Sequence, residues 1–524
     1  MALNKSLKEI ISEDKTGLLG KHVSWERVCL RDVAEVLNGY PFESNLFQSA
    51  NGMPLIRIRD VQTGSTNTYF SGEFDNQFLV NPGELLVGMD GDFNSARWKA
   101  KPSLLNQRVC KLTVDERFYS DRLLELLLPG FLAAIHAETS SVTVKHLSSK
   151  SIQEIELPLP PAAEQTRIVE KLEELLSDLD AGVAELKAAQ KKLGQYRQSL
   201  LKAAVEGALT ADWRKRQAAL PVAEAIESGA ALLARILTER RNRWETRQLA
   251  KFQTQGKAPP KDWQAKYPEP VGPDSKDLPV LPRGWVWASV DQCALDETGI
   301  TDGPFGSNLK SSHYQETGPR VVRLKNIGEG IFVNANAHIS PAHFELLKKH
   351  AVLEHDLLVA MLGEVLPRVC IAPADIAPAI VKADCARIRI NQELISPFIL
   401  TTAMNSQPTR DRVSGLVKGI GRPRINLGHV RLIAIAISPI EEQTQIDLVL
   451  KNGLENVVRQ LDAISFSLKQ ATAQRKNILQ AAFSGQLVPQ DPADEPASEL
   501  LARIRTERAG QPKLPKPRQT RRVV

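Results

Sequence analysis

Basic side chains recur among predicted turns in two separate parts of the chain. The planar fork of arginine suits guanine edges and phosphates, whereas lysine serves mainly as a phosphate counter-charge. For any one of these residues an ordinary surface charge is the simpler interpretation, so only the recurrence favours nucleic-acid binding. The first set is Arg57 and Arg59 on one predicted strand face, Arg97, Lys99 and Lys101 around Trp98, and Lys145 with His146; the second is Arg323, Lys325, Arg368, Lys418, Arg422 and Arg424.

The sequence carries none of the common signatures of catalysis. It has no GxxxxGK[ST] phosphate loop, no HExxH zinc motif, no GxSxG elbow and no GxGxxG opening a helix after a strand. Its five cysteines have no CxxC spacing, which argues against a zinc site and a disulfide framework. Among the histidines, His343, His350 and His355 come closest to a cluster, but solvated or backbone-bonded rings are the simpler interpretation. We therefore expect no catalytic residue and no metal site.

The composition is that of an ordinary globular protein. The 524 residues leave room for three or four domains, with 42% hydrophobic and 24% charged residues. No run of about 18 apolar residues is present and the first residues lack an apolar core, so we expect neither a membrane span nor a secretory signal, and a cytoplasmic location. The net charge of +6 fits a polyanionic partner, although many enzymes are equally basic.

The strongest pattern is a stretch from Pro161 to Gly207 that returns without a gap from Pro439 to Gly485. Glu164-Gln165-Thr166 near the start of the first copy matches Glu442-Gln443-Thr444 in the second. In both copies apolar residues recur at a spacing of seven, which predicts a long helix with one narrow apolar stripe, as in a coiled-coil seam. The leading rows of this predicted helix seam are Leu172, Leu179, Leu186, Leu193 and Leu200, then Leu450, Val457, Ile464, Ala471 and Ile478.

A helix of about 45 residues would be a rod of roughly 67 Å that cannot bury its stripe alone. One interpretation is a leucine-zipper homodimer. The other, favoured by two copies in one chain, is that the two helices pair with each other. A second row that includes Gly182, Ala189 and Tyr196 is then expected to face the partner helix, with Gly182 and Ala189 allowing close approach.

Shorter segments repeat around the long helices. Short predicted strands broken by turns follow Trp25 and again Trp285, which predicts two mixed α+β domains. The segment at 232–240 also recurs at 500–508, so the repeat continues past each long helix. We expect an N-terminal arm at 1–20, α+β domains at 21–159 and 283–437, long helices at 160–209 and 438–487, a helical segment with a Pro-rich linker at 210–282, and a C-terminal helical segment with a basic tail at 488–524.

This order of domain, long helix, domain and long helix resembles the specificity subunit of type I restriction-modification systems. The resemblance covers about residues 20 to 510, and its most telling stretches are 157–168, 281–285 and 439–446. It implies an α+β fold with an internal pseudo-two-fold repeat, in which two target recognition domains are separated by two conserved helices that pair as an antiparallel coiled coil. In that family each recognition domain reads one half of a split, asymmetric DNA site.

The resemblance also implies partners and a division of labour. These are double-stranded DNA, two copies of a methyltransferase (M) subunit, and restriction (R) subunits, with no membrane. S-adenosylmethionine, ATP and Mg would then be bound by the partner subunits, and this chain would be a non-catalytic DNA-reading subunit. The alternative from the residues alone is a dimeric coiled-coil scaffold whose α+β domains bind proteins.

Overall fold

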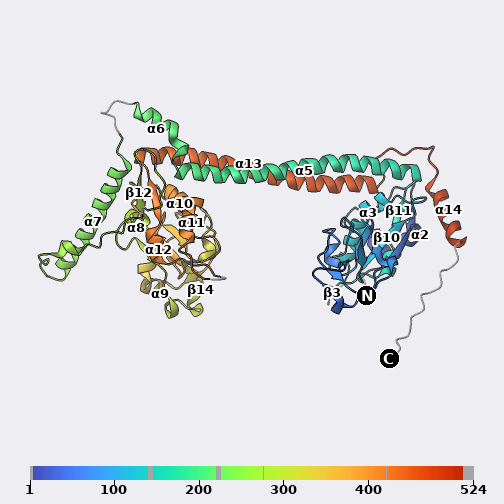
Figure 1. The fold of residues 1–524 in the computed structure, drawn as a ribbon, viewed down its shortest axis with the longest axis horizontal. Coiled ribbons are helices and arrows are strands. Elements are labelled where there is room, and N and C mark those ends of the chain that lie inside the picture. The colour runs from blue at the N-terminus through green and yellow to red at the C-terminus, as the bar shows by residue number, and fades with distance from the viewer. Residues whose placement is uncertain (1–3, 140–144, 220–225, 275, 420–421, 511–524) are drawn as a thin grey trace. The chain divides into compact units, whose positions relative to one another are not determined.

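The computed structural model describes residues 4–139, 145–219, 226–274, 276–419 and 422–510. The chain divides into two compact units: unit 1 contains residues 1–187 and 465–524, and unit 2 contains residues 188–464. The long helices α5 (Ala162–Val205) and α13 (Ile440–Phe483) both cross this division (Figure 1). Each unit therefore combines one α+β domain with the first half of one long helix and the second half of the other.

The described residues of the unit 1 domain form two sheets, a two-stranded ladder and the helices α1 to α4. The four-stranded sheet has the order β2-β10-β7-β8, the five-stranded sheet β3-β5-β4-β9-β6, and the ladder pairs β1 with β11. The elements are α1 (Leu7–Glu13), β1 (Glu26–Cys29), α2 (Leu30–Val33), β2 (Ala34–Asn38), β3 (Phe47–Gln48), β4 (Met53–Ile56), β5 (Tyr69–Phe70), β6 (Leu79–Val80), β7 (Leu85–Gly88), β8 (Asn94–Arg97), β9 (Ser103–Leu105), β10 (Val109–Val114), α3 (Asp121–Ala137), α4 (Ser149–Gln153) and β11 (Glu156–Leu159).

The domain of unit 2 repeats this plan. Its sheets have the orders β13-β20-β17-β18 and β15-β14-β19-β16, and its ladder pairs β12 with β21. Both domains contain one parallel strand pair, β4 with β9 and β14 with β19, which confirms the predicted internal repeat. The elements are β12 (Val286–Ser289), α8 (Val290–Cys293), β13 (Ile300–Asp302), β14 (Tyr314–Val322), β15 (His338–Ile339), α9 (Pro341–Leu346), β16 (Ala351–Val352), β17 (Leu357–Ala360), β18 (Arg368–Ile371), β19 (Ala379–Val381), β20 (Cys385–Ile388), α10 (Pro397–Asn405), α11 (Gln407–Ser414), α12 (Leu427–Leu432) and β21 (Ala434–Ile437).

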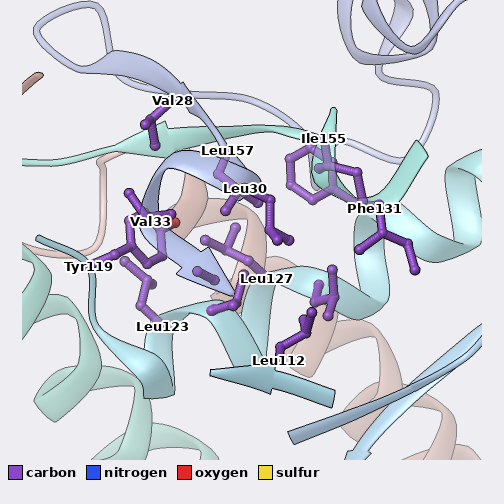
Figure 2. Packing of buried hydrophobic residues seen from close by; sticks show 14 of the residues in the cluster. Val28, Leu30, Val33, Leu112, Tyr119, Leu123, Leu127, Phe131, Ile155 and Leu157 are labelled. Carbon is purple, nitrogen blue, oxygen red and sulfur yellow. The ribbon is translucent and has the colours of Figure 1, made fainter. Parts of the chain in front are cut away.

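The core of unit 1 forms where helix α3 covers the four-stranded sheet. Leu123, Leu127 and Phe131 recur at helical spacing and are fully buried. Figure 2 shows them gathered with Leu112 of β10 and Leu157 of β11. A fully buried leucine contributes roughly 1.5–3 kcal/mol relative to an exposed one, so this face holds the helix on the sheet.

The helices at the two ends of this domain have clear local causes. The segment 1–20 packs on the domain, because α1 buries Ile10 and Ile11 in the same core. Helix α4 begins at Ser149 because Ser148 caps it by accepting a hydrogen bond from the Ser151 amide. Helix α3 extends to Ala137, and its apolar face continues through Phe131 to Ile135.

Helices α5 and α13 pack antiparallel, so the predicted pairing within one chain is correct. In unit 1 the start of α5, at Leu172, lies in one core with the end of α13, at Phe483. In unit 2 the end of α5, at Leu200, lies in one core with the start of α13, at Leu450. Of the predicted seam residues, Leu172, Leu200, Leu450, Val457 and Ile464 are buried, whereas Leu179, Leu186, Leu193, Ala471 and Ile478 are half-buried.

The second predicted row is only partly correct. Tyr196 is 51% exposed, although Ala189 and Ala203 in the same row are half-buried. A Cβ added at Gly182 would meet no described atom within 4 Å, so this glycine does not permit close approach. That role belongs to Gly453, where an added Cβ would lie 3.0 Å from Cδ1 of Leu200.

Two equivalent junctions attach the long helices to the domains. In unit 1 the buried carboxylate of Glu164, at the start of α5, accepts hydrogen bonds from Trp25 Nε1 at 3.0 Å and from Gln490 Nε2. In unit 2 the buried carboxylate of Glu442 accepts from Trp285 Nε1 at 2.8 Å and pairs with Arg214. Each tryptophan opens a domain and each third partner follows the other long helix, so one carboxylate joins three segments.

The neighbouring glutamines complete the junctions. Gln165 Oε1 accepts from the backbone amide of Ser120 at 2.7 Å, and Gln443 Oε1 accepts from that of Ser396 at 2.9 Å. Both serines are the N-caps of helices in their domains, α3 and α10. The duplicated Glu-Gln pair is therefore explained by attachment of each long helix to its domain.

Helical segments after the long helices also pack on the domains. Helices α7 (Gly229–Thr254) and α14 (Ala497–Gly510) contain the repeated nine-residue sequence, while α6 (Ala211–Ala218) precedes α7. In α7 the buried residues Leu232 and Ile236 join the core of unit 2, and in α14 Leu500 and Ile504 join the core of unit 1. The segment after each long helix thus belongs to the domain at that end.

Glycine is required where the long helices end. Gly207 has φ +73° and an added Cβ would lie 2.7 Å from Pro282 Cγ and 3.1 Å from the Trp285 ring.

We expect Gly207→Ala to destabilise unit 2 by about 1–3 kcal/mol, because left-handed backbone and a steric clash both oppose a side chain there. Calorimetric melting should show this loss. The matched control, Gly194→Ala inside α5, should instead stabilise by up to about 1 kcal/mol; equal effects of the two changes would contradict the junction geometry.

Candidate nucleic-acid interface

The arginine turns in the two domains have the same construction. Strand β4 ends at Ile56, and a 3-10 turn follows at Ile58–Asp60, so Arg57 and Arg59 do not share a strand face as predicted. The buried carboxylate of Asp60 causes this turn by accepting from the Arg57 amide at 2.9 Å. In unit 2 the turn at Leu324–Asn326 follows β14 in the same way, and buried Asn326 accepts from the Arg323 amide at 2.9 Å.

Four of the predicted basic residues in unit 1 gather around residues 57–69. Arg59 donates to Thr68 Oγ1 at 3.4 Å and the Lys101 ammonium lies 5.8 Å from the centre of the Tyr69 ring. Lys99 packs against Gly64, where an added Cβ would come within 2.9 Å of its Cγ. Arg57 is exposed and, within the described residues, no carboxylate lies within ion-pair distance of it. These groups form a basic surface suited to phosphates.

Trp98 and Arg97 have structural roles instead. The Trp98 ring is 1% exposed and donates to Lys101 O at 2.9 Å, so it cannot stack on a base. The Arg97 guanidinium binds Asp121 and Glu125 of α3, each at 2.6 Å. Burial alone would lower the pKa of Arg97, but the hydrogen bonds to these two carboxylates raise it above its usual value. Arg97 therefore fastens β8 to α3.

Lys145 and His146 lie apart from that basic surface. Lys145 donates to His136 O at 2.7 Å, and His146 Nδ1 contacts Asp90 Oδ1 at 2.5 Å. Arg108, which no sequence pattern indicated, pairs with the same aspartate at 3.3 Å. Asp90, Arg108 and His146 come from separate loops, so their spacing in the sequence could not have grouped them.

The predicted residues of unit 2 also divide into exposed and structural groups. Lys325, Lys418 and Arg422 are exposed, although residues 420–421 in the same loop lie outside the described residues. Arg368 donates to Ile327 O at 2.6 Å and to Leu324 O at 3.3 Å, so it supports the arginine turn from behind. Arg323 donates to Asn336 O at 2.7 Å, and Arg424 pairs with Asp384 at 2.8 Å.

Two further basic residues of unit 2 were not predicted. Arg320 donates to Asn334 Oδ1 at 3.0 Å and its guanidinium lies 5.8 Å from the Phe332 ring centre. The Lys382 ammonium lies 5.9 Å from the Tyr314 ring centre, which resembles the pairing of lysine and tyrosine in unit 1. In each case the signal is a contact between β14 and a loop residue distant in the sequence, and such contacts are visible only in the folded chain.

The equivalent loops that follow β2 in unit 1 and β13 in unit 2 present different aromatic rings. In unit 1 Tyr40 is 49% exposed, while Phe42 is buried among other rings. In unit 2 Gly303 stands at the position of Tyr40, and an added Cβ there would lie 2.1 Å from the Lys382 carbonyl carbon. Phe305, at the position of Phe42, is 49% exposed instead. The same loop thus offers a phenol ring in one domain and a phenyl ring in the other.

In the described part of the chain, neither a metal-binding cluster nor an exposed thiol lies on these surfaces. Among the described residues, no group of three or more His, Cys, Asp or Glu side chains is arranged to hold a metal ion. Burial raises the pKa of the thiols of Cys110, Cys293, Cys370 and Cys385 to about 12, so they stay protonated at neutral pH. No helix in the described part of the chain is long and apolar enough to cross a membrane.

Comparison with known proteins identifies the family. Residues 22–188 match the family model Methylase_S, the type I restriction modification DNA specificity domain. The EcoBI specificity subunit of Escherichia coli is 33% identical over 97% of this chain and 98% of its own length. The EcoDI specificity subunit, also from Escherichia coli, is 23% identical over 83% of this chain and 86% of its own length.

A solved structure shares the fold. A chain from a study of the complex assembly and conformational transition of the type I R-M system superposes with a TM-score of 0.57 at 15% identity. The match covers 88% of this chain and 98% of that chain. At this identity the likeness supports the fold alone.

The chain belongs to the family of type I restriction enzyme specificity subunits. It is therefore the DNA specificity subunit of a type I restriction-modification system, part of a complex that binds DNA, and catalysis is carried out by partner subunits. This confirms the resemblance seen in the sequence. It also excludes the alternative of a protein-binding dimeric scaffold, and the pairing of α5 with α13 occupies the seam that a homodimeric zipper would need.

The two arginines of unit 1 predict opposite phenotypes. Arg97→Ala should lower the stability of unit 1 by about 1–3 kcal/mol, because Asp121 and Glu125 lose a charged hydrogen-bond partner. Arg57→Ala should leave the melting temperature unchanged and weaken binding of the cognate duplex about tenfold, because its side chain is exposed. Calorimetry and fluorescence anisotropy measure the two effects. Unchanged melting with weakened DNA binding for Arg97→Ala would show that this assignment is reversed.

Proposed function

We propose that the chain reads a bipartite, asymmetric duplex site, one half with each α+β domain. In this assignment residues 21–159 and 283–437 are the two target recognition domains. Residues 160–209 and 438–487 are the conserved helices that set their spacing. Residues 1–20, 210–282 and 488–524 are the arm, the linker segment and the C-terminal segment that complete each end.

The observation that carries this proposal is one fold with two different surfaces. Both domains present an arginine at the same turn, Arg57 and Arg323, held by a buried side chain of different type. The surrounding exposed side chains differ, with Tyr40 in unit 1 and Phe305 in unit 2. Contacts to phosphates carry no sequence information, whereas contacts to base edges depend on which side chains are present. Because the exposed side chains differ, the two domains should select different bases.

The predicted basic residues are proposed to have two roles. The exposed groups Arg57, Arg59, Lys99, Lys101, Lys325, Lys418 and Arg422 are proposed to contact DNA, together with the half-buried Arg323 at its turn. The residues with close protein partners, Arg97, Lys145, His146, Arg368 and the exposed but paired Arg424, are proposed to position the loops. The seam residues of α5 and α13 are proposed to keep the helices paired.

The outer face of α13 supports a role in assembly. A paired surface helix normally presents polar residues to water, yet in unit 2 Leu448 and Val458 are each 55% exposed. In unit 2 Val458 lines a shallow groove beside Phe398. We assign this face to two methyltransferase subunits, with restriction subunits joining that complex. S-adenosylmethionine, ATP and Mg are assigned to these partners, and the cytoplasm is the compartment where the complex meets its DNA.

Methylation in a living host tests the proposal. The chain should be expressed with its methyltransferase subunit in a methylation-deficient host, and the modified bases mapped by methylome sequencing. We expect one motif with two specified halves of different sequence around an unread spacer. A contiguous motif or a palindrome would contradict the proposal.

An exchange of domains provides the control. Replacing residues 283–437 with the equivalent domain of another specificity subunit should change one half of the motif. The other half and the spacer length should stay as in the unmodified chain. A change in both halves would show that the domains do not read independently.

A further inference from the structure

Helix α7 is longer than packing on its domain requires. The nine-residue sequence that α7 shares with α14 ends at Arg240, and it supplies the buried residues that join the core of unit 2. Arg240 itself is 2% exposed and bonds to Asp291. The helix nevertheless continues to Thr254, and the chain then folds back over residues 255–267. We call residues 248–266 the α7 tip.

The α7 tip has a defined conformation. Gly256 has φ +62°, and the amide of Lys257 donates to Phe252 O at 3.0 Å, which is the hydrogen-bond pattern of a Schellman helix end. The Trp263 ring then stacks on the ring of Trp244, with centroids 5.7 Å apart and an interplanar angle of 20°. The returning chain is therefore fixed against the helix by aromatic packing.

The part of α7 before the tip is held by ion pairs. Arg247 binds Asp296 at 3.1 Å and also pairs with Glu297. Nearer the domain, Arg241 pairs with Glu245 at 3.1 Å and Arg243 with Glu239 at 3.7 Å. Since Arg247 to Thr254 spans seven residues at about 1.5 Å each, the tip extends on the order of 10 Å beyond the last of these anchors.

The charge of the α7 tip differs from that of its base. The tip has four lysines and one aspartate, a net charge of 4 − 1 = +3. Its lysines Lys251, Lys257, Lys261 and Lys266 are exposed, and none forms an ion pair with any residue in the described ranges. The arginines of α7 are thus paired with carboxylates, whereas the lysines of the α7 tip are exposed and have no carboxylate partner among the described residues.

We infer that the α7 tip binds the phosphates of duplex DNA beside the half-site read by residues 283–437. This inference rests on the proposed function. Lysine ammonium groups on flexible stems suit phosphates and carry no base preference, and the tip offers no arginine fork. Its aromatic rings pack on one another, so they are not available to stack on bases. The tip should therefore add affinity and salt dependence without adding sequence specificity.

Salt dependence of DNA binding tests this inference directly. The full chain, assembled with its methyltransferase subunits, should be compared with a variant carrying Lys251→Gln, Lys257→Gln, Lys261→Gln and Lys266→Gln. Each phosphate contact changes the slope of log K against log salt by about 0.9, so the slope should become shallower by between about 1 and 3.6. The methylated motif should be unchanged. Trimming the duplex on the side of this half-site should weaken the unmodified complex and have less effect on the variant.

A matched control removes the same charge elsewhere. Lys8, Lys150, Lys202 and Lys215 are exposed, but each already pairs with a carboxylate at 3.0–3.9 Å. Changing these four to glutamine should leave the salt slope unchanged. An unchanged slope for the tip variant would overturn the inference. So would failure of that variant to assemble with the methyltransferase subunits, which would make the tip a protein-docking surface. If the unmodified complex showed no sequence preference at all, the proposed function would fail instead.

Discussion

The buried carboxylates of Glu164 and Glu442 are the interaction on which the rest of the structure depends. Each accepts a hydrogen bond from the tryptophan that opens a domain and from a residue that follows the other long helix. A buried carboxylate is costly unless its acceptors are satisfied, so the three segments must meet for either unit to fold. This requirement explains why the Glu-Gln pair and the terminal glycines occur twice with the same spacing.

The junctions separate the constraints on the helices from those on the domains. A long helix must match its partner along the seam and its domain at the junction, so substitutions there meet several neighbours at once. The exposed side chains in the loops around Arg57 and Arg323 have fewer protein neighbours and, by our proposal, face DNA. Different residues can therefore occupy those loops without loss of the fold, and a change of target sequence needs no change in the scaffold.

Much of this architecture could be predicted from the sequence. The seven-residue apolar repeat predicted the long helices, and two copies in one chain favoured their pairing with each other. The repeated strand segments after Trp25 and Trp285 predicted the two domains. The strand expected at Arg57 and Arg59 was wrong, because a single side chain, Asp60, turns the backbone there and overrides the alternation. Arg97 resembled a surface charge because its partners, Asp121 and Glu125, lie in a helix far along the chain.

The close approach of the long helices was assigned to the wrong glycine for a related reason. Spacing identifies the residues that can face the partner helix, but it does not show which side chain lies opposite. Leu200 lies against Gly453, whereas no described atom comes near a Cβ added at Gly182. Opposition across a seam depends on the register of two helices, and that register is set by the junctions instead of by either helix alone.

The central claim is that the paired helices set the distance between two independent readers. Asp180 pairs with Arg475 across the seam, so residues 180–186 and 469–475 are opposing heptads that can be deleted together. Removing both shortens the pair by about 10 Å, the length of about three base pairs. Methylome sequencing of a host carrying this variant should show both half-sites unchanged and a spacer about three base pairs shorter. An unchanged spacer, or altered bases in either half, would contradict the account.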